Sequence, residues 1–187
     1  MPENAIERAL QEVLAYRCPR YEQLPAIPLY SDQVIDLLNQ YAGPFLSAES
    51  KQALTPAMIN NYVKQKLIAP PVKKRYDREQ LARLYCICLL KQVFSINEVR
   101  SLLEVQTRSY PFPKAYDFFC TELEKALQAS FSTRDFSAPS SASHITAESE
   151  LVRSTAFCLA HKMFSTKFLE FYLDPTHNPS LQPVQED

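Results

Sequence analysis

The 187-residue chain contains 14 prolines but only 1 glycine, whereas average usage of roughly 7% glycine and 5% proline would give about 13 and 9. Glycine-rich phosphate loops and glycine-turned β-barrels are therefore disfavoured, and a mainly helical fold is expected. Five scattered cysteines, the absence of a run of about 18 uncharged apolar residues and an acidic, amphipathic start predict a cytoplasmic protein with no membrane partner.

The charge is distributed unevenly along the chain. Residues 51–91 carry nine basic and two acidic side chains, a net charge of +7, and the rest of the chain carries 11 basic and 19 acidic residues. A basic segment within an acidic body indicates a polyanionic partner for that segment alone.

Prolines divide the chain into segments that can form helices, because proline disrupts a helix interior. Ser31 is a suitable N-cap, and Gly43 followed by Pro44 ends the helix that begins there. Thr55 and Pro56 start the next helix in the order expected for a cap and a first helical residue. Apolar spacing and capping signals predict helices over 3–16, 31–42, 55–65, from Asp77 to at least Leu89, from Ser95 to at least Leu103, 113–131 and 147–172.

The segments between these helices complete the predicted architecture. Residues 67–76 contain too many prolines for a helix and are predicted to form a tight two-stranded loop, and the serine-rich residues 132–146 an exposed loop. The fold class is all-α (mainly helical) with a short two-stranded β-wing. We divide the chain into an N-terminal helix and linker (1–28), a compact domain (29–107), a C-terminal helical region (108–174) and a disordered tail (175–187).

Two clusters in the basic segment have the chemistry of nucleic-acid binding. On helix 55–65, Met58, Ile59 and Tyr62 are expected to face inward, so that the opposite face presents polar side chains. Asparagine on a helix in the major groove can pair with adenine, and basic side chains in a neighbouring loop can contact phosphates. The outward face is expected to carry Ala57, Asn60, Asn61 and Lys64, and the loop tip Lys73, Lys74 and Arg75.

The stretch from Leu54 to Leu103 resembles the N-terminal DNA-binding region of MerR-type winged-helix regulators. In that family a tyrosine-containing recognition helix precedes a wing opened by a "GL-hydrophobic-x-P" segment and closed by "R-x-Y", and two further helices follow. The sequence TPAMINNYVKQKLI also resembles the corresponding sequence in an uncharacterised bacterial family of MerR-like proteins, a domain of unknown function. The matching positions are Tyr62, Leu67, Ile68, Pro70, Tyr76, Leu81, Leu84, Ile87, Phe94, Ser95, Ile96, Glu98, Val99, Leu102 and Leu103.

The chain departs from the MerR pattern at its turns and in its dimerisation helix. Lys66 occupies the position of the usual glycine, so the turn into the wing is expected to be made differently, and the glycine-free wing is expected to have a short tip. Pro111 and Pro113 interrupt the long helix through which MerR proteins dimerise, so the family's antiparallel coiled coil does not carry over.

The resemblance implies a MerR-like winged helix-turn-helix with an added C-terminal helical part, acting as a transcription regulator on double-stranded DNA. Helix 55–65 is expected to lie in a major groove with the wing, residues 70–76, on the flanking backbone. One such unit makes few contacts, so a homodimer reading two half-sites is expected. The predicted DNA-binding residues are Thr55, Ala57, Asn60, Asn61, Lys64, Lys66, Lys73, Lys74, Arg75 and Tyr76.

Two alternative functions remain open on the sequence. One is a non-catalytic adaptor that keeps the winged-helix fold but binds an acidic protein. The other, compatible with DNA binding, is a sensor of a small-molecule effector, with an aromatic pocket in the C-terminal region. The candidate pocket residues are Phe118, Phe119, Phe157, Phe164 and Phe168, for which core packing is the competing interpretation.

No arrangement of residues points to catalysis, a metal or a cofactor. The histidines lie far in sequence from the cysteines, and Cys86 and Cys88 point to different sides of their predicted helix. Cys120 and Cys158 are expected to act as small core residues. We therefore expect no enzymatic activity.

Overall fold

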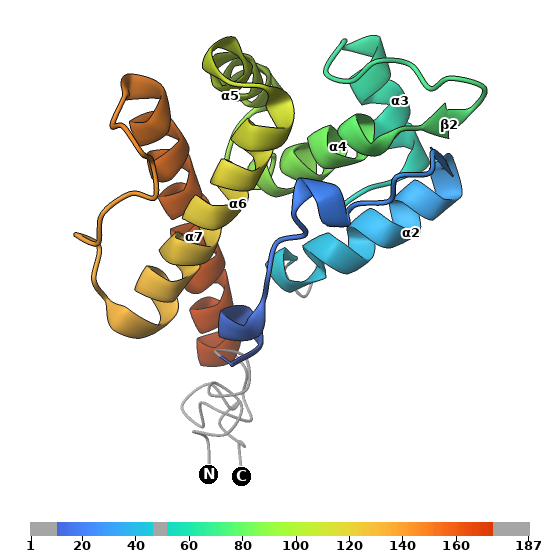
Figure 1. Ribbon diagram of the computed structural model, residues 1–187. Helices are drawn as coiled ribbons and strands as arrows, with labels where there is room; N and C mark the ends of the chain where they lie inside the picture. The colour runs from blue at the N-terminus through green and yellow to red at the C-terminus, as the bar shows by residue number, and fades with distance from the viewer. Residues whose placement is uncertain (1–10, 47–51, 174–187) are drawn as a thin grey trace, which may run out of the picture.

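The computed structural model describes residues 11–46 and 52–173, and within them the chain is mainly helical (Figure 1). Residues 11–15 are helical, so the described part agrees with the predicted helix 3–16, whose beginning lies outside it, as do residues 174–187 with the predicted tail. The α-helices that follow are α2 (Ser31–Ala42), α3 (Pro56–Lys64), α4 (Arg78–Leu90), α5 (Ile96–Ser109), α6 (Phe112–Gln128) and α7 (Ala147–Leu173). The shorter elements are η1 (Tyr21–Gln23), η2 (Gly43–Phe45), the π-helical turn η3 (Ala129–Thr133), and the strands β1 (Leu29–Tyr30) and β2 (Arg75–Tyr76).

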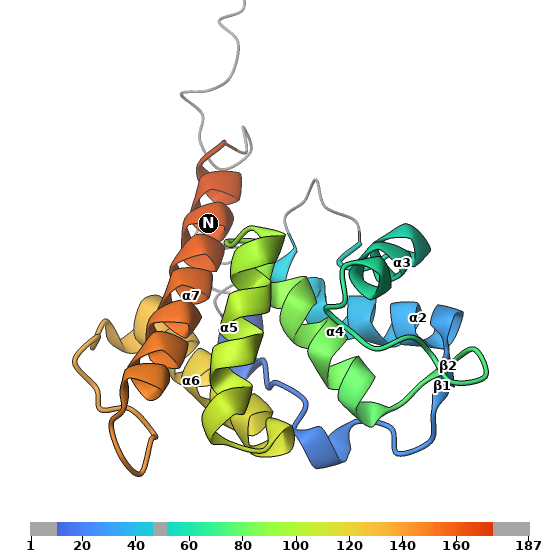
Figure 2. The same cartoon turned by 90° about the horizontal axis from the view of Figure 1, so that it is seen from above.

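The helices form two groups joined by α5 (Figures 1 and 2). In both views α2, α3 and α4 lie on one side with the strands, and α6 and α7 lie on the other. The segment 134–146 returns along the outside of α6, so that α7 starts near the start of α6 and runs in the same direction. Helix α4 packs directly against α6, and α5 packs against both α6 and α7.

Local capping signals determine where three of the helices begin. The Thr55 hydroxyl accepts a hydrogen bond from the Met58 amide at 3.3 Å, and Pro56 follows at the first helical position. Asp77 caps α4 and Ser95 caps α5, and in each case the backbone amide of the cap donates a reciprocal bond to the side chain three residues on. These three starts confirm the predicted caps at Thr55, Asp77 and Ser95, because each side chain satisfies an amide that the helix leaves without a partner. The predicted cap at Ser31 is wrong, because Ser31 is the first residue of α2 and Tyr30 precedes it as the N-cap.

The two-stranded sheet differs from the predicted wing in its pairing. Strand β1 precedes α2 and pairs antiparallel with β2, with Leu29 opposite Tyr76 and Tyr30 opposite Arg75. Within the predicted loop only Val72 pairs with Arg75, as an isolated bridge. The fold class is confirmed as mainly helical with a small sheet, but one strand comes from residues outside 67–76.

One hydrophobic core extends through both groups of helices, from Val13 to Met163. Helix α4 lies at its centre, with ten consecutive helical positions from Leu81 to Leu90 buried except Arg83. The N-terminal segment is held to α6 by Glu124, whose carboxylate receives two hydrogen bonds from Arg20, at 2.8 and 3.0 Å, and one from the Cys18 amide at 2.8 Å.

One prediction about the C-terminal region is wrong, and one of the alternatives that the sequence left open is not supported. Cys158 is exposed rather than in the core, because it lies on the solvent side of α7. The five phenylalanines proposed for a pocket do not converge: Phe119 is fully buried in the core, Phe157 packs against Phe136, and Phe164 stacks on Phe168.

Candidate nucleic-acid interface

Helix α3 presents the outward face that its sequence predicts. Ile59 and Tyr62 are buried, and Met58 is partly buried against the core. The exposed side chains are Pro56, Ala57, Asn60, Asn61 and Lys64. Asn61 accepts a hydrogen bond from Gln65 at 3.1 Å, whereas the Asn60 amide has no partner among the described residues and faces solvent. The helix therefore offers one short polar face with a free amide.

Asn39 of α2 fixes the chain that leads into α3. Its side-chain oxygen accepts hydrogen bonds from the amides of Ala53 and Leu54, at 2.8 and 2.9 Å, and its nitrogen donates to the Leu54 carbonyl at 3.1 Å. Lys91 holds the same segment at a second point, because its ammonium group donates to the Ala53 carbonyl and lies 3.2 Å from the Met58 sulfur. Burial lowers the pKa of this lysine.

The C-terminal end of α3 is closed by Lys66 in the left-handed conformation, with φ 57°. The Leu67 amide donates to the Tyr62 carbonyl at 2.9 Å, and the Lys66 amide donates to the Val63 carbonyl at 3.0 Å. This pair of bonds is a Schellman motif, in which glycine is the usual residue at the left-handed position. The expectation of a different turn is therefore wrong: Lys66 adopts the geometry of the glycine that it replaces.

The tip of the basic loop is a two-residue turn made by Lys73 and Lys74. Val72 and Arg75 exchange two backbone hydrogen bonds of 3.0 Å, and the two lysines between them have φ values of 49° and 63°. Positive φ at both central residues is the pattern of a type I′ turn, which strongly favours Asn-Gly. A left-handed backbone costs a residue with a Cβ roughly 1–2 kcal/mol, so both lysines are held at an energetic cost.

Arg75 is held in place at the base of this turn. Its guanidinium lies 4.7 Å from the centre of the Tyr30 ring, and its Nη2 donates to the Tyr30 hydroxyl at 2.9 Å. Both side chains remain exposed. The contact orients the arginine and leaves its charge uncompensated by any acidic side chain of the described chain.

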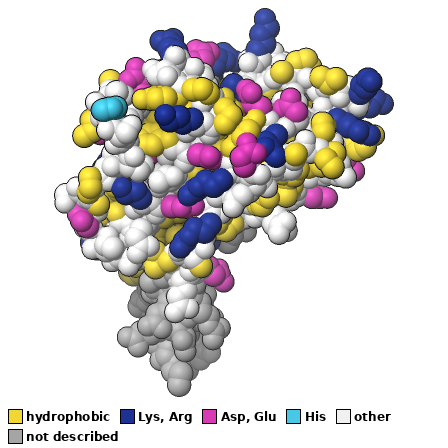
Figure 3. All heavy atoms as spheres, in the orientation of Figure 1, with side chains coloured by type: hydrophobic (Ala, Val, Ile, Leu, Met, Phe, Trp, Pro, Cys, Tyr) yellow, Lys and Arg dark blue, Asp and Glu magenta, His cyan; other side chains and the backbone are white. Residues whose placement is uncertain are grey.

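The basic residues of segment 51–91 separate into two kinds. The first kind already has a partner: Arg78 pairs with Glu22, and Arg83 pairs with Glu79 at 2.8 Å. Lys91 belongs to the same kind, because it donates to a backbone carbonyl before α3. Among the described residues, no acidic side chain pairs with Lys64, Lys66, Lys73, Lys74 or Arg75. We call these five residues the basic edge. Lysine and arginine side chains project from the end of the molecule that carries α3 and β2 (Figure 3).

Two of the predicted contact residues do not present a free side chain. Tyr76 is 5% exposed and packs in the core, where burial raises its pKa. The Thr55 hydroxyl is occupied in capping α3. Tyr76 is therefore removed from the predicted contact set, and Thr55 positions the helix.

Arg100 of α5 is a positioning residue that the sequence did not indicate. Its Nη2 donates to the Gln65 carbonyl, at the end of α3, at a distance of 2.7 Å. The contact joins residues 35 positions apart, so no local pattern marks it. Asn39 was missed for the same reason, because its three bonds reach residues 14 and 15 positions away.

The fold and this edge define a mainly helical protein with a short two-stranded sheet and an unpaired basic edge. Residues 19–119 match the family described as "Domain of unknown function (DUF1836)". The match covers more than half of the chain, which therefore belongs to this family. No curated protein and no solved structure matches the chain.

Two further findings concern the described residues, 11–46 and 52–173, as a whole. They contain no group of three or more His, Cys, Asp or Glu side chains placed to hold a metal ion. None of their helices has the length and apolar character needed to cross a membrane.

Proposed function

We propose that this protein binds double-stranded DNA as a transcription regulator of the MerR-like winged-helix kind. The observation that carries the proposal is the basic edge, in which five cations lack an acidic partner among the described residues. Three of them, Lys66, Lys73 and Lys74, occupy left-handed positions where glycine or asparagine would be more stable. Strain at exposed cationic residues supports a role for their charge in binding.

In this proposal α3 enters the major groove and the turn at Lys73 and Lys74 lies on the adjacent backbone. The exposed Asn60 amide can donate to N7 and accept from N6 of adenine, which is base readout. The lysines contact phosphates, which contribute affinity and register without reading the sequence. The resemblance of residues 54–103 to MerR-type regulators supports this arrangement.

The proposal is tested by fluorescence anisotropy with the duplex upstream of the protein's own gene, over a range of salt concentrations. Five neutralised phosphates predict a slope of log K against log salt of about −4.5, at roughly −0.9 per contact. Lys73→Gln, Lys74→Gln and Arg75→Gln together retain long polar side chains and are expected to reduce the slope by about 2.7. Lys162→Gln, on the exposed side of α7, is the matched control and should leave the slope unchanged.

Base reading is tested separately with Asn60→Ala. This change should reduce discrimination between sequences more than it reduces affinity for a non-specific duplex, and Asn97→Ala on the exposed side of α5 is the control. Equal loss on all sequences would contradict base readout by Asn60. Binding that is indifferent to the three changes in the turn would contradict the wing assignment, and saturable binding to an acidic protein with none to DNA would replace the proposal with the adaptor function.

We propose further that the protein acts as a homodimer. A single α3 and a single turn contact few base pairs, and two-fold symmetry doubles the contacts on a palindromic site. Light scattering coupled to gel filtration gives the mass directly, and a binding stoichiometry of two chains per duplex is expected. A monomer in solution that also binds one chain per duplex would contradict it.

A further inference from the structure

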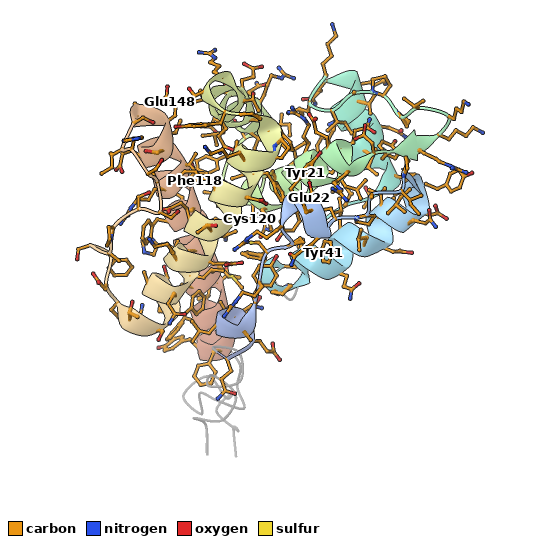
Figure 4. All side chains as sticks on the ribbon, in the orientation of Figure 1. Tyr21, Glu22, Tyr41, Phe118, Cys120 and Glu148 are labelled. Atoms are coloured by element: carbon orange, nitrogen blue, oxygen red, sulfur yellow. The ribbon has the colours of Figure 1, made fainter. Side chains whose placement is uncertain are left out.

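A cavity of about 390 Å³ lies between the end of α5, the start of α6 and the start of α7. Its walls include Tyr110, Ala115, Phe118 and Val152, and residues 141–144 border it from the returning segment. In Figure 4, Phe118 lies on the side of α6 that faces α7, and Glu148 lies on the first turn of α7. The volume falls in the range of about 300–1,000 Å³ found for small-molecule sites.

Gln106 is the observation that points to a ligand. Its side chain lines the cavity and is only 8% exposed, and its amide forms no hydrogen bond within the described residues. The fully enclosed side-chain atoms without a partner in the described chain are Arg78 Nε and Ser130 Oγ, so the Gln106 amide remains open to the cavity. A polar group of a bound molecule can therefore reach this amide and form a hydrogen bond with it.

Lys114 and Glu148 are charged side chains that border the cavity. The Lys114 ammonium lies 4.9 Å from the centre of the Tyr110 ring and has no carboxylate partner within the described chain. The Glu148 carboxylate accepts hydrogen bonds from its own backbone amide and the Thr146 side chain, which hold the pKa of its carboxyl below its usual range. Lys114 is therefore the unpaired cation that can form an ion pair with an anionic group of a ligand.

The returning segment that forms one wall is anchored rather than loose. The Ser141 amide donates to the Glu122 carboxylate at 2.6 Å, and Glu122 is itself buried on α6. Arg153 of α7 donates to the Ala138 carbonyl. These bonds keep the wall in place without a ligand, as expected for a preformed site.

We propose that this cavity binds a small amphipathic carboxylate, with an apolar body against Phe118 and Val152. The carboxylate pairs with Lys114 and accepts a hydrogen bond from the Gln106 amide. This site is distinct from the basic edge and does not depend on DNA binding. It also differs from the predicted pocket, since of the five phenylalanines only Phe118 lines it.

Isothermal titration with 4-phenylbutyrate, and with the uncharged 4-phenylbutan-1-ol, tests the site on the full chain. One saturable site per chain is expected for the carboxylate at concentrations up to about 10 mM, the weak end of specific binding. Lys114→Met should weaken the carboxylate about tenfold and the alcohol less than twofold, since only the carboxylate forms an ion pair. Gln106→Leu, which keeps the volume and removes the amide, should weaken the carboxylate by roughly threefold to tenfold.

Two further variants separate binding in the cavity from binding elsewhere. Ala142→Trp places a large ring into the cavity from the half-buried wall, and should abolish binding while the circular dichroism spectrum and the melting temperature are retained. Lys162→Met, which removes a charge outside the cavity, should change nothing. Absence of saturable binding, binding that survives in folded Ala142→Trp, or equal weakening of carboxylate and alcohol by Lys114→Met would each overturn the proposal.

Discussion

Nη2 of Arg100 donates a hydrogen bond to the Gln65 carbonyl at 2.7 Å, and thereby ties α5 to the last turn of α3. The Gln65 carbonyl lies just after the helix, where carbonyl groups lack intrahelical partners. A guanidinium is suited to this position because it satisfies the carbonyl and its positive charge opposes the negative end of the helix dipole.

Arg100→Leu is expected to destabilise the protein by about 1–2 kcal/mol, since a hydrogen bond from a charged donor is lost and the carbonyl is left unsatisfied. Urea unfolding followed by circular dichroism measures the change. Arg108→Leu is the control, because Arg108 is exposed on the same helix. Equal effects of the two variants would show that the bond to Gln65 contributes nothing specific.

Substituting glycine for Lys66 or Lys74 is expected to stabilise the fold by about 1 kcal/mol each, because the left-handed backbone then carries no Cβ. Lys64→Gly is the matched control and should destabilise by roughly 0.5–1 kcal/mol, because residue 64 has a helical backbone as the last residue of α3. The same two stabilising variants should bind DNA more weakly. Stability that falls in Lys66→Gly would contradict the strain assigned to that turn.

Asn39→Ala is expected to reduce the free energy of unfolding by about 2–3 kcal/mol, as two backbone amides and one carbonyl before α3 lose their partner. Hydrogen exchange should accelerate at the amides of Ala53 and Leu54 more than elsewhere. Gln40→Ala, exposed on the same helix, should have little effect on either measurement. Uniform acceleration across the chain would indicate global destabilisation rather than local release of α3.

The helix starts were predictable because their signals are local. Thr55, Asp77 and Ser95 each satisfy an amide three residues ahead, so a short window of sequence contains both partners. The missing glycines also located the turn at Lys66, for which the sequence suggested a different geometry, and the short tip at Lys73 and Lys74. Lysine so seldom adopts a left-handed backbone that its identity argued against the turn that it makes.

The hydrogen bonds between residues far apart in the sequence could not be predicted from the sequence. Asn39 and Arg100 act on residues that only the folded chain brings close, and Gln106 becomes distinctive only because the start of α7 packs beside it. Cys158 was misplaced for a related reason. Apolar residues occupy most of the circumference of α7, so its sequence does not show which side faces solvent.

Thiol chemistry checks the placement of the cysteines. Cys158 is exposed and the other four are buried, so Ellman's reagent should titrate one thiol per native chain and five in denaturant. Burial raises the pKa of Cys88 to about 12 and also raises those of Cys86 and Cys120. Cys158→Ser should abolish the native reaction. A rapid second thiol in the native state would show that a buried cysteine is accessible.

The same raised pKa values determine how stability depends on pH. Above the ordinary thiol pKa of about 8.5 the unfolded chain releases protons that the folded chain retains, so the free energy of unfolding falls with rising pH. Each of Cys86, Cys88 and Cys120 should contribute a slope approaching 1.4 kcal/mol per pH unit in this range. Urea midpoints between pH 8 and 10 measure the slope, and Cys88→Ala should make it shallower.

Helix α5 joins the cavity to α3, and this connection leads to a prediction about coupling. Gln106 and Arg100 are six residues apart on one helix, or about 9 Å at 1.5 Å per residue. A ligand that engages Gln106 restrains the end of α5, and Arg100 extends the restraint to Gln65. Saturating 4-phenylbutyrate should slow hydrogen exchange at the Lys66 and Leu67 amides about twofold to fivefold, and Arg100→Leu should remove this effect without changing ligand affinity by more than twofold. Coupling between two sites requires a structural element whose equilibrium both sites influence. If 4-phenylbutyrate still slows hydrogen exchange at these amides in Arg100→Leu, the coupling does not pass through the hydrogen bond from Arg100 to Gln65.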